Sequence, residues 1–177
     1  MKVSDLQGEV RSYNGSGLWS VESVQRRYQE YCATCHVESS RSLAPREFTE
    51  GDVHWIYPVM EEVIQGIEEG DAACVALGVD FVEENGPFPF GTRLKSNTAR
   101  ALRRTKLTDL QKSRLRQRVV TMLALGVIPR EMREYVKLLR TLGVGEHWSR
   151  LDSDIPRENP YAMRFYKSLR AAEGHPA

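Results

Sequence analysis

The sequence predicts an all-α fold, either a compact bundle or a short stack of about six to seven helices. Apolar residues recur at spacings of three and four along most of the chain, which is the period of an α-helix. The breaks between these stretches carry residues that start and stop helices, rather than the alternation that is typical of strands. The 177 residues, of which 41% are hydrophobic, are enough to bury a core without disulfide bonds.

Residues that cap helix N-termini set the predicted element boundaries. Ser20, Asp71 and Thr108 each carry a side-chain oxygen that can accept a hydrogen bond from the first turn of a helix. Gln111 follows Thr108 by three residues, which is a capping-box pattern. Pro58 is tolerated in a first turn, where its missing N–H costs little. The predicted helices lie near residues 21–35, 57–70, 71–84, 92–104, 108–126, 129–143 and 159–173.

The predicted helices are divided into three stretches that we expect to form one compact unit. These are an N-terminal segment over 1–50, a helical domain over 51–150, and a C-terminal helix with its tail over 151–177. The polar residues 38–50 predict a loop across the surface at the first boundary. Asn85, followed by a glycine, predicts the end of the third helix.

Charge is segregated along the chain although the formal net charge is only +1. Residues 47–92 hold eleven acids and no Lys or Arg, a balance of −11. Residues 93–118 hold ten bases and the single acid Asp109, a balance of +9. We expect the two segments to pack side by side and to screen one another, which makes nucleic acid an unlikely partner. The remaining charge can steer a protein partner.

The sequence lacks the features that several classes of protein function require. No segment approaches the roughly 18 consecutive apolar residues of a membrane-spanning helix. Lys2, Asp5 and Glu9 stand where a signal peptide has its apolar core, which predicts a cytoplasmic chain. A Gly-rich phosphate loop, a G-x-S-x-G elbow and an H-E-x-x-H motif are all missing from the sequence, so we do not expect an enzyme. The oligomeric state is left open.

One constellation carries specific chemistry, the segment Cys32-Ala33-Thr34-Cys35-His36. Its C-x-x-C-H form is that of covalent haem attachment, in which two thiols bond the porphyrin and the next histidine binds the iron. Three cysteines are too few for a disulfide scaffold in a chain of this size. Cys74 lies in an apolar helical stripe and is predicted to be part of the core.

The residues from Val24 to His36 resemble the first helix of a c-type cytochrome, with aromatic residues leading into the motif. The resemblance covers about 16 residues, 21–36, and it departs at Val37, where such cytochromes often have glycine. It implies a small electron-transfer protein that meets a redox partner protein, and a periplasmic location if haem is attached. It further implies thioether bonds from Cys32 and Cys35, His36 as the proximal iron ligand, and Met60 or His54 as the distal one.

Other chemistry is open to the same motif. Cys32, Cys35 and His36 together with His54 or Cys74 have the ligand types of a zinc site. A reversible dithiol is a further alternative, although a pair at the end of a helix lacks the helix N-terminus that lowers a thiol pKa. The cysteines can also be structural, in which case the sequence predicts a non-catalytic helical domain that binds another protein through its charged faces.

Overall fold

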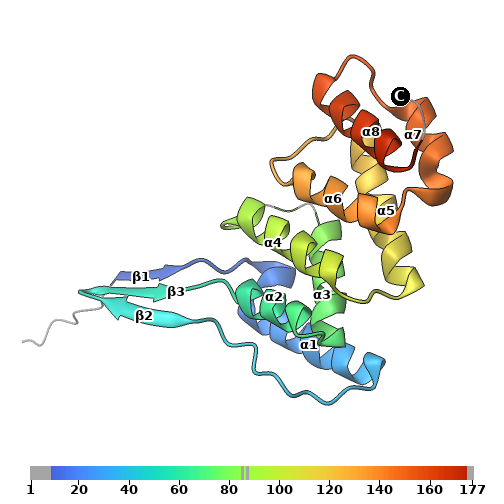
Figure 1. Ribbon diagram of the computed structural model, residues 1–177. Helices are drawn as coiled ribbons and strands as arrows, with labels where there is room; N and C mark the ends of the chain where they lie inside the picture. Colours follow the sequence, from blue (N-terminus) through green and yellow to red (C-terminus); the bar gives the residue numbers. More distant parts are fainter. Residues whose placement is uncertain (1–8, 85, 87, 175–177) are drawn as a thin grey trace, which may run out of the picture.

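The computed structural model describes residues 9–84, 86 and 88–174, and within them it contains eight α-helices and three short strands (Figure 1). The helices are α1 (Val21–Cys35), α2 (Met60–Glu68), α3 (Ala72–Glu83), α4 (Gly91–Arg104), α5 (Asp109–Ala124), α6 (Met132–Leu142), α7 (Trp148–Asp154) and α8 (Pro160–Ala172). The strands are β1 (Glu9–Ser12), β2 (Glu47–Glu50) and β3 (Val53–Ile56). The prediction of a mostly helical fold is confirmed, whereas the prediction of a purely helical one is wrong, and the described residues hold eight helices rather than the six to seven predicted.

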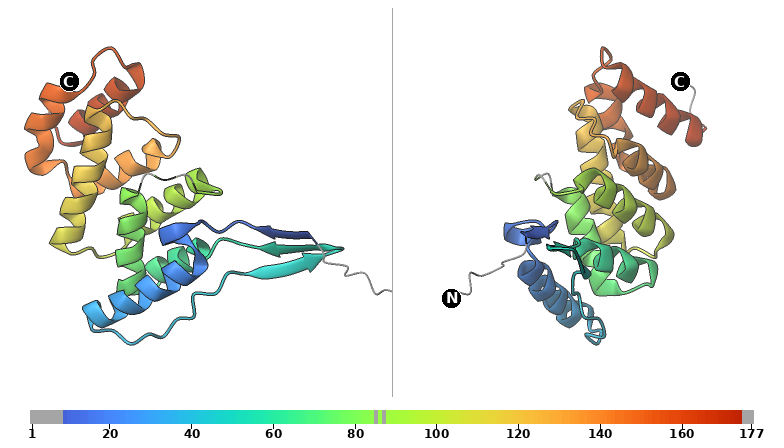
Figure 2. Two further views of the ribbon diagram at one scale, coloured as in Figure 1. Left: turned by 180° about the vertical axis from the view of Figure 1, so that it is seen from behind. Right: turned by 90° about the vertical axis from the view of Figure 1, so that its left-hand side faces the viewer.

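The helices form a two-layer stack. In one layer α1, α3, α5 and α7 follow one another, and each packs against the next; in the other layer α2, α4, α6 and α8 do the same. Contacts such as α2 with α3 and α5 with α6 join the layers. Figure 1 and Figure 2 show the chain rising through this stack from α1 and α2 at one end to α7 and α8 at the other. Within the described part of the chain, no helix is long and apolar enough to cross a bilayer.

The N-caps predicted from the sequence are present. The Ser20 side chain accepts a hydrogen bond from the Ser23 N–H at 3.2 Å, and Asp71 accepts from the N–H groups at the start of α3. Thr108 and Gln111 form the reciprocal pair of hydrogen bonds of a capping box at the start of α5. These local hydrogen bonds explain why the starts of α1, α3 and α5 could be predicted closely.

The region before α2 differs from the prediction. The helix expected from residue 57 begins at Met60, because residues 53–56 pair as a strand. The surface loop expected over 38–50 ends in strand β2. A short helix, α7, also interrupts what was expected to be a connection to the last helix. Asn85, the expected end of the third helix, lies outside the described residues.

The three strands form a sheet in the order β1-β3-β2, with β1 parallel and β2 antiparallel to β3. Glycine at position 51, with a φ of 59°, opens the tight turn between β2 and β3 and takes a backbone conformation that favours glycine. None of the three strands packs against a helix of the described chain, and the sheet projects from the side of the stack (Figure 1, Figure 2). We call residues 9–13 and 46–57 the arm.

A buried carboxylate ties three helices of one layer together. Asp80 on α3 is 8% exposed and accepts hydrogen bonds from Arg27 and Tyr31 on α1, at 2.6 and 2.5 Å. It also accepts one from Arg114 on α5 at 2.8 Å. Arg114 continues to Glu83, one turn further along α3. The network satisfies a charge that would otherwise be costly to bury.

Candidate functional site

The C-x-x-C-H motif lies at the C-terminal end of α1, partly inside the core. Cys32 is 4% exposed on the face of α1 that packs against α3, beside the phenol of Tyr28. Cys35 is half-buried, and burial raises the pKa of its thiol, with Cys32 and Asp71 adding to the shift. His36 is exposed and ends the helix in the left-handed conformation, with a φ of 54°.

The two candidate distal ligands lie elsewhere. Met60 is fully buried in the first turn of α2. His54 is on β3 of the arm, where its ring contacts Thr49 and Glu47 at 3.0 Å each. Figure 1 shows the end of α1 and the arm at opposite sides of the molecule. No group of three or more His, Cys, Asp or Glu side chains in the described residues could hold a metal ion.

This placement does not fit a haem or a zinc ion bound by the motif, because the proposed ligands do not converge on one point. One thiol faces the core while the histidine faces solvent, and both distal candidates belong to other regions of the fold. Haem attachment therefore stays a prediction of the motif alone.

An absorption spectrum distinguishes between the haem attachment predicted by the motif and the absence of haem that the geometry favours. From the geometry we expect protein that is co-produced with haem-attachment machinery to show no Soret band after acid–acetone extraction. The Cys35→Ala variant, which lacks one thioether donor, should give the same spectrum as the wild type. A band that resists extraction in the wild type and is lost in Cys35→Ala would establish covalent haem and require the end of α1 to rearrange.

A different surface combines charge with concave shape. The three successive helices α4, α6 and α8 of one layer each present basic residues to the same side of the stack. These residues, which we call the basic face, are Arg93, Arg100, Arg103, Arg133, Lys137, Arg140 and Arg164. In α6, Arg133, Lys137 and Arg140 follow one another at spacings of four and three, so they share one stripe of the helix.

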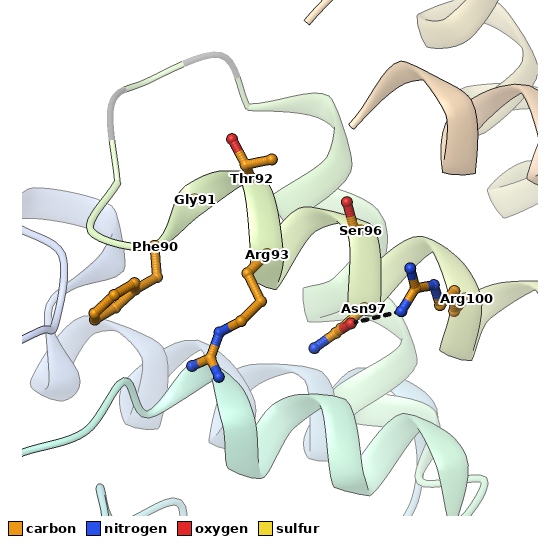
Figure 3. A pocket seen from close by; sticks show the side chains of 7 residues that line it. All are labelled: Phe90, Gly91, Thr92, Arg93, Ser96, Asn97 and Arg100. Carbon is orange, nitrogen blue, oxygen red and sulfur yellow. Dashed lines mark hydrogen bonds between the residues drawn. The ribbon is translucent and has the colours of Figure 1, made fainter. Parts of the chain in front are cut away.

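A cavity of about 510 Å³ lies at the start of the basic face (Figure 3). Phe90, Arg93, Asn97 and Arg100 contribute to its lining, and the Arg93 guanidinium lies 5.4 Å from the centre of the Phe90 ring. Arg93 also pairs with Glu61 of α2 at 2.5 Å. Arg93 therefore has a counterion within the chain, which it shares with Arg46, and more of the bases of the face lie further along the stack.

The groove between α6 and α8 is the most strongly basic of these cavities. It has a volume of about 530 Å³, and no carboxylate belongs to its lining. We call it the basic groove, and its lining residues are Arg133, Val136, Lys137, Arg140, Arg164, Phe165 and Ser168. A second cavity of about 530 Å³ adjoins it on the α4 side and shares Lys137 and Arg140.

A buried glutamate lies beneath the face and orders several of its bases. Glu134 is 6% exposed and pairs with Lys137 at 2.9 Å, Arg100 at 3.3 Å and Arg103 at 3.7 Å. Burial raises the pKa of Glu134, but hydrogen bonds and the charges of Lys137 and Arg100 outweigh burial and leave the pKa below its usual value. The carboxylate thus stays ionised at neutral pH. Its single negative charge is shared by Lys137, Arg100 and Arg103, so these three bases together keep a positive excess.

The sequence pointed to part of this face only. The predicted basic run over 93–118 includes Lys95, yet this side chain is buried and donates a hydrogen bond to the Glu84 carbonyl at 2.8 Å. Arg114 belongs to the Asp80 network. The bases of α6 and α8 lie beyond the run, and their helical spacing was the signal that could have identified them.

Comparison of the chain with family models, with curated proteins and with solved structures gives no match. The fold and the chemistry of the surface are therefore what supports a function.

Proposed function

We propose that this chain is a non-catalytic interaction module whose basic groove binds an acidic segment of a protein partner. The observation that carries the proposal is the lining of the groove, in which four cationic side chains and no carboxylate surround a cavity of about 530 Å³. Glu134 balances Lys137 from beneath, but four like charges with one internal carboxylate leave a positive excess that attracts an anionic ligand from solution.

The floor of the groove favours a protein segment over a nucleic acid. Val136 is 3% exposed and Phe165 is partly buried, and both line the cavity between the bases. Nucleic-acid bases bind such grooves by stacking on open aromatic rings, whereas Phe165 is packed against the core beside Val136 and is not an open platform. An acidic peptide with one aromatic or aliphatic side chain offers both, with charged residues at the rim and an apolar anchor at the centre.

Charge reversal in the groove tests the proposal. Arg133 and Arg140 are both exposed, so the double variant Arg133→Glu/Arg140→Glu should fold normally. We expect it to bind a fluorescent peptide of Glu and Asp residues around one Phe at least about tenfold more weakly than the wild type at low salt. Fluorescence anisotropy measures the affinity, and circular dichroism confirms the fold.

A matched control is available in the other layer. Arg26 on α1 and Lys112 on α5 are surface bases, so Arg26→Glu/Lys112→Glu makes the same change in net charge away from the groove. Its affinity should stay within about threefold of the wild type, since neither side chain lines the groove and a distant charge acts on the peptide more weakly than a direct ion pair. Equal losses in both double variants would contradict a specific groove. Binding of a single-stranded oligonucleotide but not of the peptide would contradict the class of partner.

A further inference from the structure

The arm has an aromatic face that the rest of the described chain covers only in part: Phe90 packs on Tyr13 at 4.8 Å between ring centres, and the Arg11 guanidinium lies 5.0 Å from the centre of the Trp55 ring, whereas Phe48 is left exposed. Tyr13, Phe48, Trp55 and Tyr57 lie on one side of the sheet, with ring centres 5.9 Å apart from Tyr13 to Trp55, 6.1 Å from Trp55 to Phe48 and 5.7 Å from Phe48 to Tyr57. Phe48 is 42% exposed. A three-stranded sheet ordinarily buries such a face against a second layer. The exposed ring of Phe48, at the open part of this face, therefore indicates a surface for association.

The part of the arm farthest from the stack is acidic. Glu47, Glu50 and Asp52 lie on β2 and the turn after it, and all three are exposed. Together with Phe48 they make the hairpin over 47–52, which carries three carboxylates and one exposed aromatic ring. This is the chemistry that the basic groove takes under the proposed function.

We propose that the hairpin over 47–52 of one copy binds the basic groove of a second copy. The carboxylates of the hairpin meet the bases of the groove rim, and Phe48 contacts the apolar floor formed by Val136 and Phe165. The inference rests on the proposed function and names its partner as the chain itself.

The shape of the molecule directs this contact to another copy. Figure 1 and Figure 2 show the arm projecting from the α1 and α2 end of the stack, with the turn between β2 and β3 at its far tip. The groove lies between α6 and α8, near the opposite end. Because hairpin and groove are far apart on one chain, two copies can exchange arms, and each then fills the groove of its partner. Such a pair closes as a two-fold dimer.

Complementary charge reversal tests the inference on the full-length chain. The arm variant is Glu50→Lys/Asp52→Lys, which leaves the glycine of the turn in place. The groove variant is Arg133→Glu/Arg140→Glu. By light scattering at high protein concentration and low salt, the wild type should have a mass above 20.2 kDa that falls to 20.2 kDa as salt is raised. Each variant alone should be monomeric, and an equimolar mixture should form a complex of about twice that mass.

Recovery in the mixture is the decisive result, because a lysine-bearing hairpin fits only a glutamate-bearing groove and the unchanged hairpin still fits the unchanged groove. A control with Glu146→Lys/Glu158→Lys, two exposed acids outside the arm, should self-associate like the wild type. A wild type that is monomeric at every concentration, or an arm variant that associates like the wild type, overturns the inference. If the groove nevertheless binds the acidic peptide, the proposed function stands; if it does not, both fail.

Discussion

Replacing Asp80 with asparagine is expected to lower the free energy of unfolding by about 3–5 kcal/mol, because it leaves the buried Arg27 without its counterion. Arg27 has a side chain only 13% exposed and loses the ion pair that it forms with Asp80. Arg114 keeps its ion pair with Glu83 but loses its ion pair with Asp80. An asparagine can still accept a hydrogen bond from Tyr31, but it cannot balance either charge.

Urea denaturation followed by circular dichroism measures this loss. Glu83→Gln is the matched control, since it also removes a carboxylate bound to Arg114, but from a side chain that is 30% exposed. We expect the control to cost about 1 kcal/mol or less, because solvent and Asp80 still compensate Arg114. A loss below about 1 kcal/mol for Asp80→Asn would show that the network does not hold α1, α3 and α5 together.

Replacing Gly66 with alanine is expected to destabilise the chain by about 2 kcal/mol. Gly66 is buried on the side of α2 that packs against α3, and a Cβ there would lie 2.8 Å from the Cβ of Cys74 and 3.1 Å from Nε of Arg41. Ordinary carbon contacts are about 3.5–4.0 Å, so the two helices must separate. Overpacking costs about 1–3 kcal/mol, here at the upper end, and higher helix propensity returns about 1 kcal/mol.

Thermal unfolding distinguishes packing from propensity for this substitution. Packing predicts that Gly66→Ala lowers the melting temperature by about 4–8 °C, whereas helix propensity alone predicts a rise. Adding Cys74→Ala removes the sulfur nearest to the new methyl group and should restore about half of the loss. A higher melting temperature for Gly66→Ala would contradict the close approach of α2 and α3 at this position.

Local hydrogen-bonding chemistry was the part of the fold that could be predicted. The starts of α1, α3 and α5 could be predicted from Ser20, Asp71 and Thr108, because an N-cap is formed by residues close in sequence. The sheet could not be predicted from the sequence, because each of its strands is only four residues long and Glu47–Glu50 is exposed throughout, so no alternation of apolar and polar residues marks it. Its pairing of residues 9–12 with 53–56 depends on contacts across more than 40 positions.

The candidate site likewise has a part that the sequence could predict and a part that it could not. The spacing of Cys32, Cys35 and His36 is a local pattern, and it carries no information on what the fold places opposite these residues. The basic groove is formed by α6 and α8 across a turn and a short helix, so no single segment contains it. Arg133, Lys137 and Arg140 do share one helix, and their spacing alone could have predicted the stripe on α6.

The two-layer stack also determines how the chain comes apart. A helix in such a stack touches only its neighbours, so stability is close to a sum of local terms, and opening can begin at an end. The Asp80 network joins α1, α3 and α5 into one cooperative unit, whereas α7 and α8 lie at the free end beyond it. The backbone amides of α8 should thus exchange with solvent through partial opening, while those of α3 exchange only when the whole unit unfolds. The basic groove is built on this less stable end, so a ligand that fills it would also protect α8.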